Sequence, residues 1–314
     1  MTQEERNAWL AERKTGIGGS EVAAILGLSP WATPVTVWLD KTGRSAPQEE
    51  NEAMRIGTEL EDFVARRYCQ ETGNTVQRFT KMIHKGCMLG NFDRLVVPHG
   101  AKVASHMGEV RTDTLLECKT GSREWTDGVP IYYMTQVMWY LGLEPKLLHA
   151  DVAYLNLNYK HFEIHRVERD DEVIKTLQER AQAWWVKHVV NDKIPEPMNE
   201  VDCKLLWAKS NPGKKVTATS ETVELIESLK KVKDDFDRIS EDKKKLESDI
   251  KAKFGDAEVL IGLDGKPLAT WKSARDKEVV DWKAIAAEYN PTKEIIAKHT
   301  TLETGSRRFL LKSA

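Results

Sequence analysis

Two short apolar segments near the middle of the chain each carry an acidic side chain. Residues 89–97 contain Asp93, and residues 114–120 contain Glu117, followed two positions later by Lys119. Clustered carboxylates bind a hard divalent cation such as Mg²⁺ through oxygen, and an ammonium group beside them can orient a water or stabilise a developing anion. Metal-assisted hydrolysis of a phosphodiester requires this combination of groups.

Both segments have the composition of strands, and strand geometry decides whether these side chains can meet. Side chains two apart on a strand project from the same face, so Glu117 and Lys119 can point into one site. Their neighbours Leu116 and Cys118 then point the other way, into a core. If the two strands pair as a hairpin, Asp93 comes within reach of Glu117. Taken alone, a Glu-X-Lys pair on a strand is more often a solvated face.

Other elements of the chain must position these groups. The chain has 314 residues and a net charge of −2, and 40% of its residues are hydrophobic and 31% are charged. This length allows one large domain with an appendage, or two domains. The composition is ordinary for a globular protein and supplies no overall basic field. Any contact with DNA must therefore come from a local patch.

The cysteines and the apolar segments of the sequence indicate the cellular compartment in which the protein is expected. The four cysteines are scattered and form no Cys-x-x-Cys pair, which argues against a zinc ribbon, an iron–sulfur cluster and a disulfide framework. The first residues are not typical of a signal peptide, and no apolar run approaches transmembrane length. We therefore expect a cytoplasmic protein with no membrane partner.

A glycine-rich turn at residues 15–19 separates a predicted helix over residues 3–14 from a second one that follows Ser20. Ser20 is a suitable N-cap, and glycines ahead of a helix expose N–H groups that favour an anion. A plain capped turn explains the same residues. No Gly-Lys-Ser/Thr sequence follows, so the turn is not a P-loop and an ATP-driven motor is disfavoured. A third helix is expected to end near Gly43.

Helical periodicity then predicts a helix over residues 54–68. Its core-facing stripe is expected to consist of Ile56, Leu60, Phe63, Val64 and Arg67. Glu61 borders this stripe and can reach a buried cation, although a solvated acid is the simpler interpretation of the periodicity alone. A strand-like segment, residues 75–85, leads into the central hairpin.

A strongly apolar helix is predicted over residues 131–142, opened by Pro130 and closed by Gly142. Gln136 lies inside it and needs a partner if it is buried. Two interpretations stay open: a satisfied core amide, or a side chain that positions a ligand or water.

Two strands, residues 147–154 and 159–168, and an amphipathic helix, residues 170–190, are predicted next. His161 and His165 are four apart, a spacing that would suggest a metal pair on a helix. Because the surrounding alternation favours a strand, we interpret them as ordinary histidines. Prolines and polar residues then indicate a boundary near residues 195–215.

The C-terminal part differs in composition. Residues 220–254 are dense in charge with apolar residues at near-heptad steps, which predicts one long helix or a tight helical hairpin. An Asp264-Gly265 turn flanked by apolar runs predicts a β-hairpin. A helix over residues 282–289 and a strand over residues 307–312 are expected to follow. The tail shows no catalytic constellation.

Taken together, five ordered blocks resemble the YqaJ-type phage recombination nucleases, the group that includes phage lambda exonuclease and carries the PD-(D/E)XK motif. The blocks are residues 18–31, 57–61, 90–94, 116–119 and 133–137. The resemblance covers about residues 5 to 195.

The resemblance implies a role for each matching residue. The implied ligands of Mg²⁺ or Mn²⁺ are Glu61, Asp93, Glu117 and the backbone carbonyl of Cys118. This role for Glu61 replaces the solvated interpretation. Lys119 matches the lysine that activates or orients the attacking water, and Gln136 matches the glutamine near the scissile phosphate.

The resemblance also implies that Arg13 and Ser20 hold the 5′-terminal phosphate of DNA. Two departures from the family pattern stand out. The loop between Asp93 and Glu117 is long, which leaves the hairpin register open, and a compact exonuclease of this kind does not need the tail after about residue 215.

We therefore expect an α/β PD-(D/E)XK core over residues 1–200, with a mixed central sheet flanked by helices, and a helical and β-hairpin appendage over residues 215–314. The expected function is metal-dependent 5′→3′ exonuclease action on double-stranded DNA ends. It would produce 3′ overhangs for a single-strand annealing protein in the bacterial host of a phage or prophage. By family analogy the protein would be a ring-shaped trimer.

Two other functions fit the sequence. The first is an endonuclease with the same two-acid-plus-lysine site. The second is a DNA-end-binding scaffold with a vestigial site, which uses the long helix to recruit a recombinase. The intact set of two acids and a lysine argues against the scaffold.

Overall fold

A computed structural model describes residues 3–45, 51–277, 279, 281–289 and 291–301. The chain divides into two units, Met1–Trp207 and Ala208–Ala314. The strand expected over residues 307–312 lies outside the described residues.

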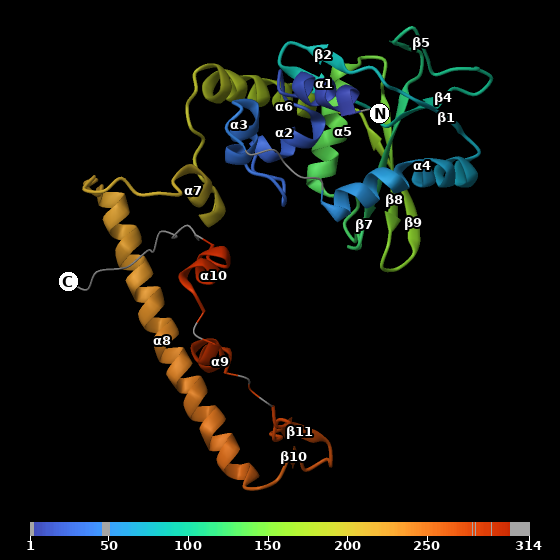
Figure 1. Cartoon of the computed structure of the whole chain (residues 1–314). Helices are drawn as coiled ribbons and strands as arrows, with labels where there is room; N and C mark the ends of the chain where they lie inside the picture. The colour runs from blue at the N-terminus through green and yellow to red at the C-terminus, as the bar shows by residue number, and fades with distance from the viewer. Residues whose placement is uncertain (1–2, 46–50, 278, 280, 290, 302–314) are drawn as a thin grey trace. The chain divides into compact units, whose positions relative to one another are not determined.

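The first unit is built on a five-stranded sheet with the strand order β1-β4-β7-β8-β9 (Figure 1). Strand β7 pairs in parallel with β8, and the other neighbouring strands of this sheet are antiparallel. The mixed sheet and its helices confirm the predicted α/β class. The strands are Thr75–Arg78 (β1), Arg94–Val97 (β4), Thr114–Gly121 (β7), His149–Asn156 (β8) and His161–Glu168 (β9).

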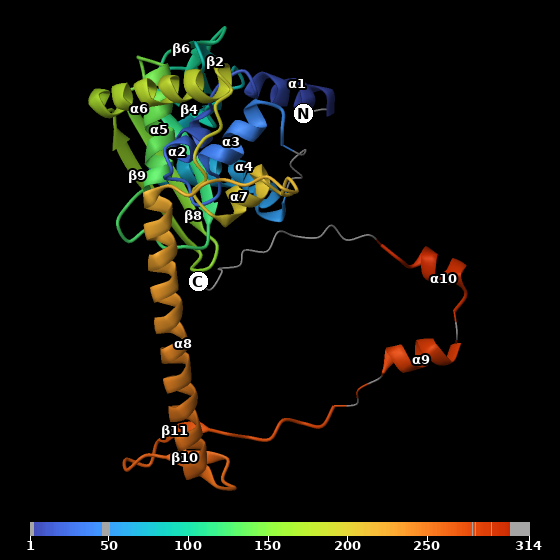
Figure 2. The ribbon, with the colours of Figure 1, turned by 90° about the vertical axis from the view of Figure 1, so that its left-hand side faces the viewer.

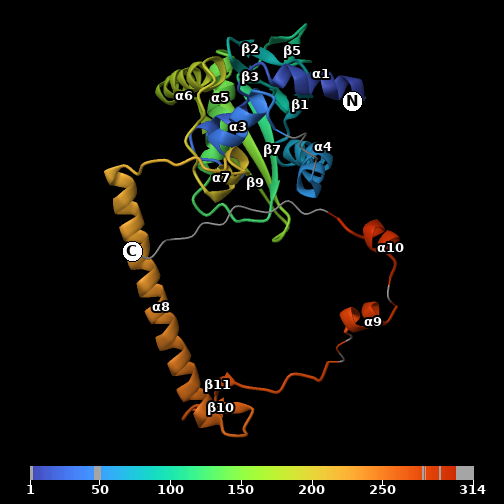
Figure 3. The same cartoon turned by 60° about the vertical axis from the view of Figure 1, so that its left-hand side comes forward.

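Helices cover both faces of this sheet, as Figures 1 and 3 show for α5 and α4. Helix α5 packs with α2 and α6 in the larger apolar core, and α4 packs in the smaller one. Leu115 belongs to the first core and Leu116 to the second, so successive residues of β7 face opposite layers. These helices are Gly19–Ile25 (α2), Glu52–Thr72 (α4), Ile131–Leu143 (α5) and Asp171–Trp184 (α6).

Helix α5 connects the parallel strands β7 and β8, and every residue from 135 to 143 is buried. A helix that is apolar on all sides is stable only when it is enclosed, which the sheet, α2 and α6 accomplish. Gly142 does not close the helix as predicted, because α5 continues to Leu143. A Cβ atom on Gly142 would lie 2.6 Å from Cγ2 of Ile174, so this glycine permits close packing of α5 on α6.

The predicted core stripe of α4 is partly wrong. The buried residues are Val64, Ala65 and Tyr68, whereas Phe63 is 44% exposed and Arg67 is also exposed. The periodicity predicted one face of α4 to be buried. The face that packs on the sheet is displaced from it by about one residue along the helix. The buried phenol of Tyr68 fixes this orientation by donating a hydrogen bond to Asp151 at 2.5 Å.

The predicted N-cap of α2 is also wrong, because Gly18 is the N-cap and the helix begins at Gly19, two residues earlier than a Ser20 cap implies. The carboxylate of Glu21 accepts a hydrogen bond from the Gly18 amide at 2.7 Å. A glutamate three residues into the helix therefore satisfies the first amide, and Ser20 is left as a side chain on the first turn.

Other elements differ from the prediction in extent. The segment over residues 75–85 is two strands, since β2 (Ile83–Lys85) leaves the main sheet and pairs with β3 (Met88–Gly90). The loop before β7 holds a small hairpin of β5 (Ser105–His106) and β6 (Glu109–Val110). Helix α6 continues as the π-helix η1 (Trp185–Val190). The remaining helices of this unit are Gln3–Arg13 (α1), Pro34–Lys41 (α3) and Glu200–Leu206 (α7).

In the second unit, α8 (Ser220–Phe254) is one continuous helix, which excludes the helical hairpin (Figure 2). The predicted β-hairpin forms from β10 (Val259–Ile261) and β11 (Pro267–Thr270). The helices α9 (Trp282–Tyr289) and α10 (Lys293–Lys298) follow. Among the described residues, no helix combines the length and apolar character needed to cross a membrane.

Candidate active site

The pairing of β4 with β7 brings the two acidic segments together. Arg94 lies opposite Leu116 and Leu95 lies opposite Leu115, so the expected hairpin pairing is confirmed and its register is defined. Asp93 directly precedes β4. Its Oδ2 atom accepts a hydrogen bond from the backbone amide of Cys118 at 2.8 Å.

Glu117 lies at the centre of the site and is only 2% exposed. Its Oε1 atom accepts hydrogen bonds from Nζ of Lys119 at 2.6 Å and from Nε2 of Gln136 at 2.7 Å. Its Oε2 atom is buried and has no hydrogen-bond partner among the described residues. Because an unpaired buried carboxylate oxygen is costly, this atom is suited to bind a cation or a water.

The charges in this site are unbalanced toward the acids. Burial, and then the charge of Glu117, raise the pKa of Asp93 well above its ordinary value. Burial also raises the pKa of Glu117, although Lys119 opposes the shift. Burial alone would lower the pKa of Lys119, but Glu117 and Asp93 raise it, so Lys119 remains an ammonium. A site of this kind attracts a further positive charge.

On the α4 side of the sheet, Arg94 is 4% exposed and forms ion pairs with Glu61 and Asp62. It also donates a hydrogen bond to the backbone carbonyl of Asp93 at 2.6 Å. Glu61 is therefore a half-buried partner of Arg94. Its charge still contributes to the raised pKa of Asp93 and of Glu117.

The structure thus brings together Asp93, Glu117, Lys119 and Gln136, while Glu61 is held by Arg94. Within the part of the chain that the structure describes, no three His, Cys, Asp or Glu residues are grouped as a metal-binding cluster. Arg94 was not predicted from the sequence to be a functional residue. Its position directly after Asp93 on a strand was the available signal, because alternation places it on the opposite face, toward α4.

The side chain of Cys118 points away from the acids and packs against the smaller core. This agrees with the alternation predicted for β7. Only the backbone of Cys118 belongs to the site, where its amide binds Asp93.

Arg13 and Ser20 lie next to each other. Nη2 of Arg13 is 3.4 Å from Oγ of Ser20 and 3.1 Å from Oε1 of Glu21. The buried ammonium of Lys41 also binds Glu21, at 2.8 Å, and donates to the backbone carbonyl of Arg13. Glu21, which orients the arginine, was not predicted from the sequence to be a functional residue.

Tyr140 connects this turn to the acids. Its hydroxyl accepts a hydrogen bond from Gln136 at 3.0 Å. Its ring lies against α2, where a Cβ atom on Gly19 would be only 2.4 Å from Cε1 of Tyr140. The first turn of α2 is therefore packed directly against α5, the helix that carries Gln136.

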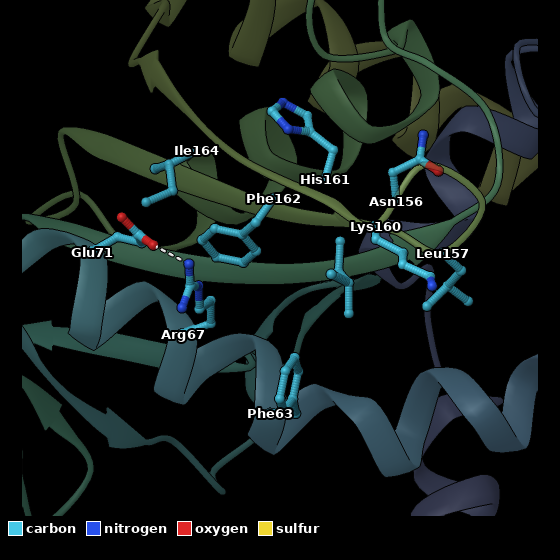
Figure 4. A pocket seen from close by; sticks show the side chains of 10 residues that line it. Phe63, Arg67, Glu71, Asn156, Leu157, Lys160, His161, Phe162 and Ile164 are labelled. Carbon is cyan, nitrogen blue, oxygen red and sulfur yellow. Dashed lines mark ion pairs between the residues drawn. The ribbon is translucent and has the colours of Figure 1, made fainter.

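A separate hollow on this unit lies away from the candidate active site. A groove of about 680 Å³ lies between α4 and the β8–β9 turn, as Figure 4 shows. Its lining residues include Phe63, Arg67, Leu157 and Phe162. None of the acids or the lysine of the site lines it.

With this geometry established, comparisons identify the class of protein. Residues 8–143 match the family described as the YqaJ-like viral recombinase domain. The chain is 32% identical over 321 aligned positions to the protein YqaJ of Bacillus subtilis (strain 168), and the alignment covers 98% of this chain and 94% of that protein. The chain therefore belongs to the YqaJ-like viral recombinase family.

Two solved structures are similar at lower identity. The alkaline exonuclease LHK-Exo from Laribacter hongkongensis is 20% identical with a TM-score of 0.45, covering 59% of this chain and 93% of that chain. A phage related exonuclease from Haemophilus somnus 129PT is 15% identical with a TM-score of 0.41, covering 57% and 96% of the two chains.

Proposed function

We propose that this protein is a metal-dependent deoxyribonuclease that degrades double-stranded DNA from its 5′ ends and leaves 3′ single-stranded overhangs. One observation carries the proposal: two buried carboxylates with raised pKa values meet beside one lysine, and one oxygen of Glu117 has no partner among the described residues. Membership of a viral recombinase family supports DNA as the substrate.

The residues present fit a hard divalent cation. Asp93 and Glu117 would hold Mg²⁺ or Mn²⁺ through carboxylate oxygen, with the carbonyl of Cys118 as a further ligand. Oε2 of Glu117 accepts no hydrogen bond from the described residues and would be available to bind the cation. Glu61 would complete the set by exchanging part of its ion pair with Arg94. When bound, the cation would supply Lewis-acid polarisation of the phosphate and a more acidic water.

Lys119 and Gln136, which contact Glu117, would each have a separate role in the reaction. Lys119, as an ammonium, donates hydrogen bonds and would orient the attacking water and stabilise the negative charge that develops on the phosphate. Gln136 fixes the Glu117 carboxylate from α5 and would keep its free oxygen directed toward the cation. Hydrolysis then adds water across one P–O bond of the DNA backbone.

A preference for DNA ends is supported by the turn before α2. Arg13 and Ser20 present a guanidinium and a hydroxyl at neighbouring positions, which is suitable chemistry for a terminal 5′-phosphate. Tyr140 packs this turn against α5, so a phosphate bound there would have a fixed relation to the acids.

The nuclease domain would comprise residues 1–200, and residues 215–314 would form an appendage that contacts other proteins. A single-strand annealing protein is the proposed partner, because 3′ overhangs are its substrate. We further propose a trimer that encloses DNA and an activity located in the cytoplasm of a bacterial host.

The form of the DNA tests this proposal. Linear duplex with 5′-phosphate, linear duplex with 5′-hydroxyl and covalently closed circles are each incubated with Mg²⁺ and the full chain. We expect rapid degradation of the 5′-phosphorylated duplex, slower degradation of the 5′-hydroxyl duplex and intact circles. Cutting of the circles would establish the endonuclease instead, and binding of ends without cleavage would establish the scaffold.

A further inference from the structure

Three aromatic side chains continue outward from the candidate active site. Nζ of Lys119 lies 4.8 Å from the centroid of the Tyr133 ring. The Tyr133 ring lies 4.5 Å from the Tyr132 ring and 5.9 Å from the Trp31 ring, and Trp31 lies 4.7 Å from Tyr132. We call Trp31, Tyr132 and Tyr133 the aromatic platform.

The platform is held from behind by a second set of contacts. Trp125 lies 5.5 Å from Tyr133 and stacks on Tyr154 at 3.9 Å with an interplanar angle of 11°. The hydroxyl of Tyr154 in turn donates a hydrogen bond to the carbonyl of Arg123 at 2.7 Å. The inner end of the platform is therefore anchored to β8 and to the loop after β7.

The outer end of the platform is open. Trp31 is 68% exposed, although it contacts two other rings. Its turn is ordered locally, since the Trp31 amide donates a hydrogen bond to Oγ of Ser29 at 3.2 Å. A purely structural role would be expected to bury the indole. Here the indole instead offers surface to solvent while it contacts Tyr133, the ring that lies next to Lys119.

We propose that the aromatic platform stacks an unpaired nucleobase of the DNA strand whose phosphate is being hydrolysed. This rests on the proposed function, because Lys119 marks the position of the scissile phosphate. Every base has a π-face, so stacking on aromatic side chains tolerates any sequence, and it contributes a factor of roughly 5 to 150 in affinity per base. A strand end that is separated from its complement before cleavage needs such a surface.

A coupling experiment between protein and DNA tests this role. The probes are 5′-phosphorylated single-stranded oligonucleotides, either intact or abasic at one of the first four positions. Their binding to the full chain is measured by fluorescence anisotropy with EDTA, so no hydrolysis occurs. The variants are Trp31→Ala, Trp31→Phe and Trp282→Ala, whose tryptophan is 74% exposed in the other unit and serves as the matched control.

For the wild-type chain and Trp282→Ala, we expect one or two abasic positions to weaken binding about 5- to 150-fold. In Trp31→Ala the same abasic positions should cause no further loss, and Trp31→Phe should restore part of the dependence. Thermal unfolding of each variant confirms that the fold is kept.

The proposal is overturned if abasic substitution has the same effect in Trp31→Ala as in the wild-type chain, if it has no effect on the wild-type chain, or if the wild-type chain does not bind the intact oligonucleotide. If only the proposed nuclease function is wrong, the result is different. Binding would still depend on the bases, but linear duplex DNA would stay intact after Mg²⁺ is added.

Discussion

The side-chain amide of Gln136 donates a hydrogen bond to Glu117 across 2.7 Å, joining the buried helix α5 to strand β7. The same amide also reaches the hydroxyl of Tyr140, at 3.0 Å. A lone glutamine in an apolar helix therefore orients one carboxylate and contacts the tyrosine that supports the turn before α2.

Replacing Gln136 with Met should remove the hydrogen bond while keeping the volume. We expect a loss of about 1–3 kcal/mol in the free energy of unfolding, since a buried carboxylate loses a donor. Because Glu117 is no longer held in place, we also expect a fall of at least about tenfold in kcat. Chemical denaturation and steady-state DNA digestion measure the two effects.

Gln178→Met is the matched control for that variant. Gln178 donates to the carbonyl of Gly142 at 3.0 Å, on α6 and away from the acids. It should lose stability without a fall in kcat. Equal falls in kcat for both variants would contradict the role assigned to Gln136.

Gly19→Ala tests the packing of α2 on α5. The new Cβ atom would lie 2.4 Å from Cε1 of Tyr140, so the ring or the helix must shift. Overpacking of this kind costs about 1–3 kcal/mol, and we expect weaker discrimination between 5′-phosphate and 5′-hydroxyl ends. Gly57→Ala is the control, because its nearest atom would be 3.9 Å away and alanine is favourable inside α4. If Gly19→Ala discriminates between 5′-phosphate and 5′-hydroxyl ends as well as the wild-type chain does, the proposed link between the turn and α5 is wrong.

Because of Glu21, the free energy of unfolding should decrease as the pH is lowered into the acid range. Burial alone would raise its pKa, but Lys41, then Arg13 and the Gly18 amide, lower it below its ordinary value. A carboxyl whose pKa is lower in the folded state stabilises the protein above its unfolded pKa, and this contribution is lost as pH falls through the folded value.

Glu21→Gln should therefore cost about 2–3 kcal/mol near pH 7, because Lys41 keeps a buried charge without its carboxylate. The difference from the wild-type chain should shrink as pH falls below the ordinary glutamate pKa, and it should disappear once pH has fallen through the lowered pKa of Glu21 in the folded state. Denaturation across pH measures this, with Glu200→Gln on the surface of α7 as the control. A difference that does not change with pH would show that the ion pair is not its cause.

Asp93→Asn should separate stability from function. Its carboxylate is buried next to Glu117, and burial raises its pKa, so neutralising it should raise the unfolding temperature in EDTA. The amide oxygen can still accept the hydrogen bond from Cys118. We expect added Mg²⁺ to raise the unfolding temperature of the wild-type chain, as ligand binding to the folded state must, but not that of the variant. Equal stabilisation by Mg²⁺ would exclude Asp93 as a ligand.

Individual residues show which parts of the fold and of the candidate site could be predicted from the sequence. Strand alternation placed Glu117 and Lys119 on one face, and the pairing of β4 with β7 put Asp93 beside them as expected. Local periodicity could not show that Arg94 holds Glu61, because this ion pair joins a strand to a helix whose rotation is set by packing. The same rotation exposed Phe63, which the periodicity of α4 had assigned to the core.

The cap of α2 shows a second limit. Ser20 has the right chemistry for an N-cap, but Glu21 satisfies the Gly18 amide and also binds Lys41, which comes from α3. The glutamate that caps the helix is therefore also held by a lysine 20 residues away, and no local pattern contains that contact.

The most direct test of the central claim is the release of nucleotides from uniformly labelled linear duplex DNA. Protein freed of metal by EDTA is given Mg²⁺, and the wild-type chain, Asp93→Asn, Lys119→Ala and the surface control Lys175→Ala are compared. We predict release by the wild-type chain and Lys175→Ala only, and none before Mg²⁺ is added. Release by folded Asp93→Asn or Lys119→Ala at the wild-type rate, or no release by the wild-type chain, would contradict the account.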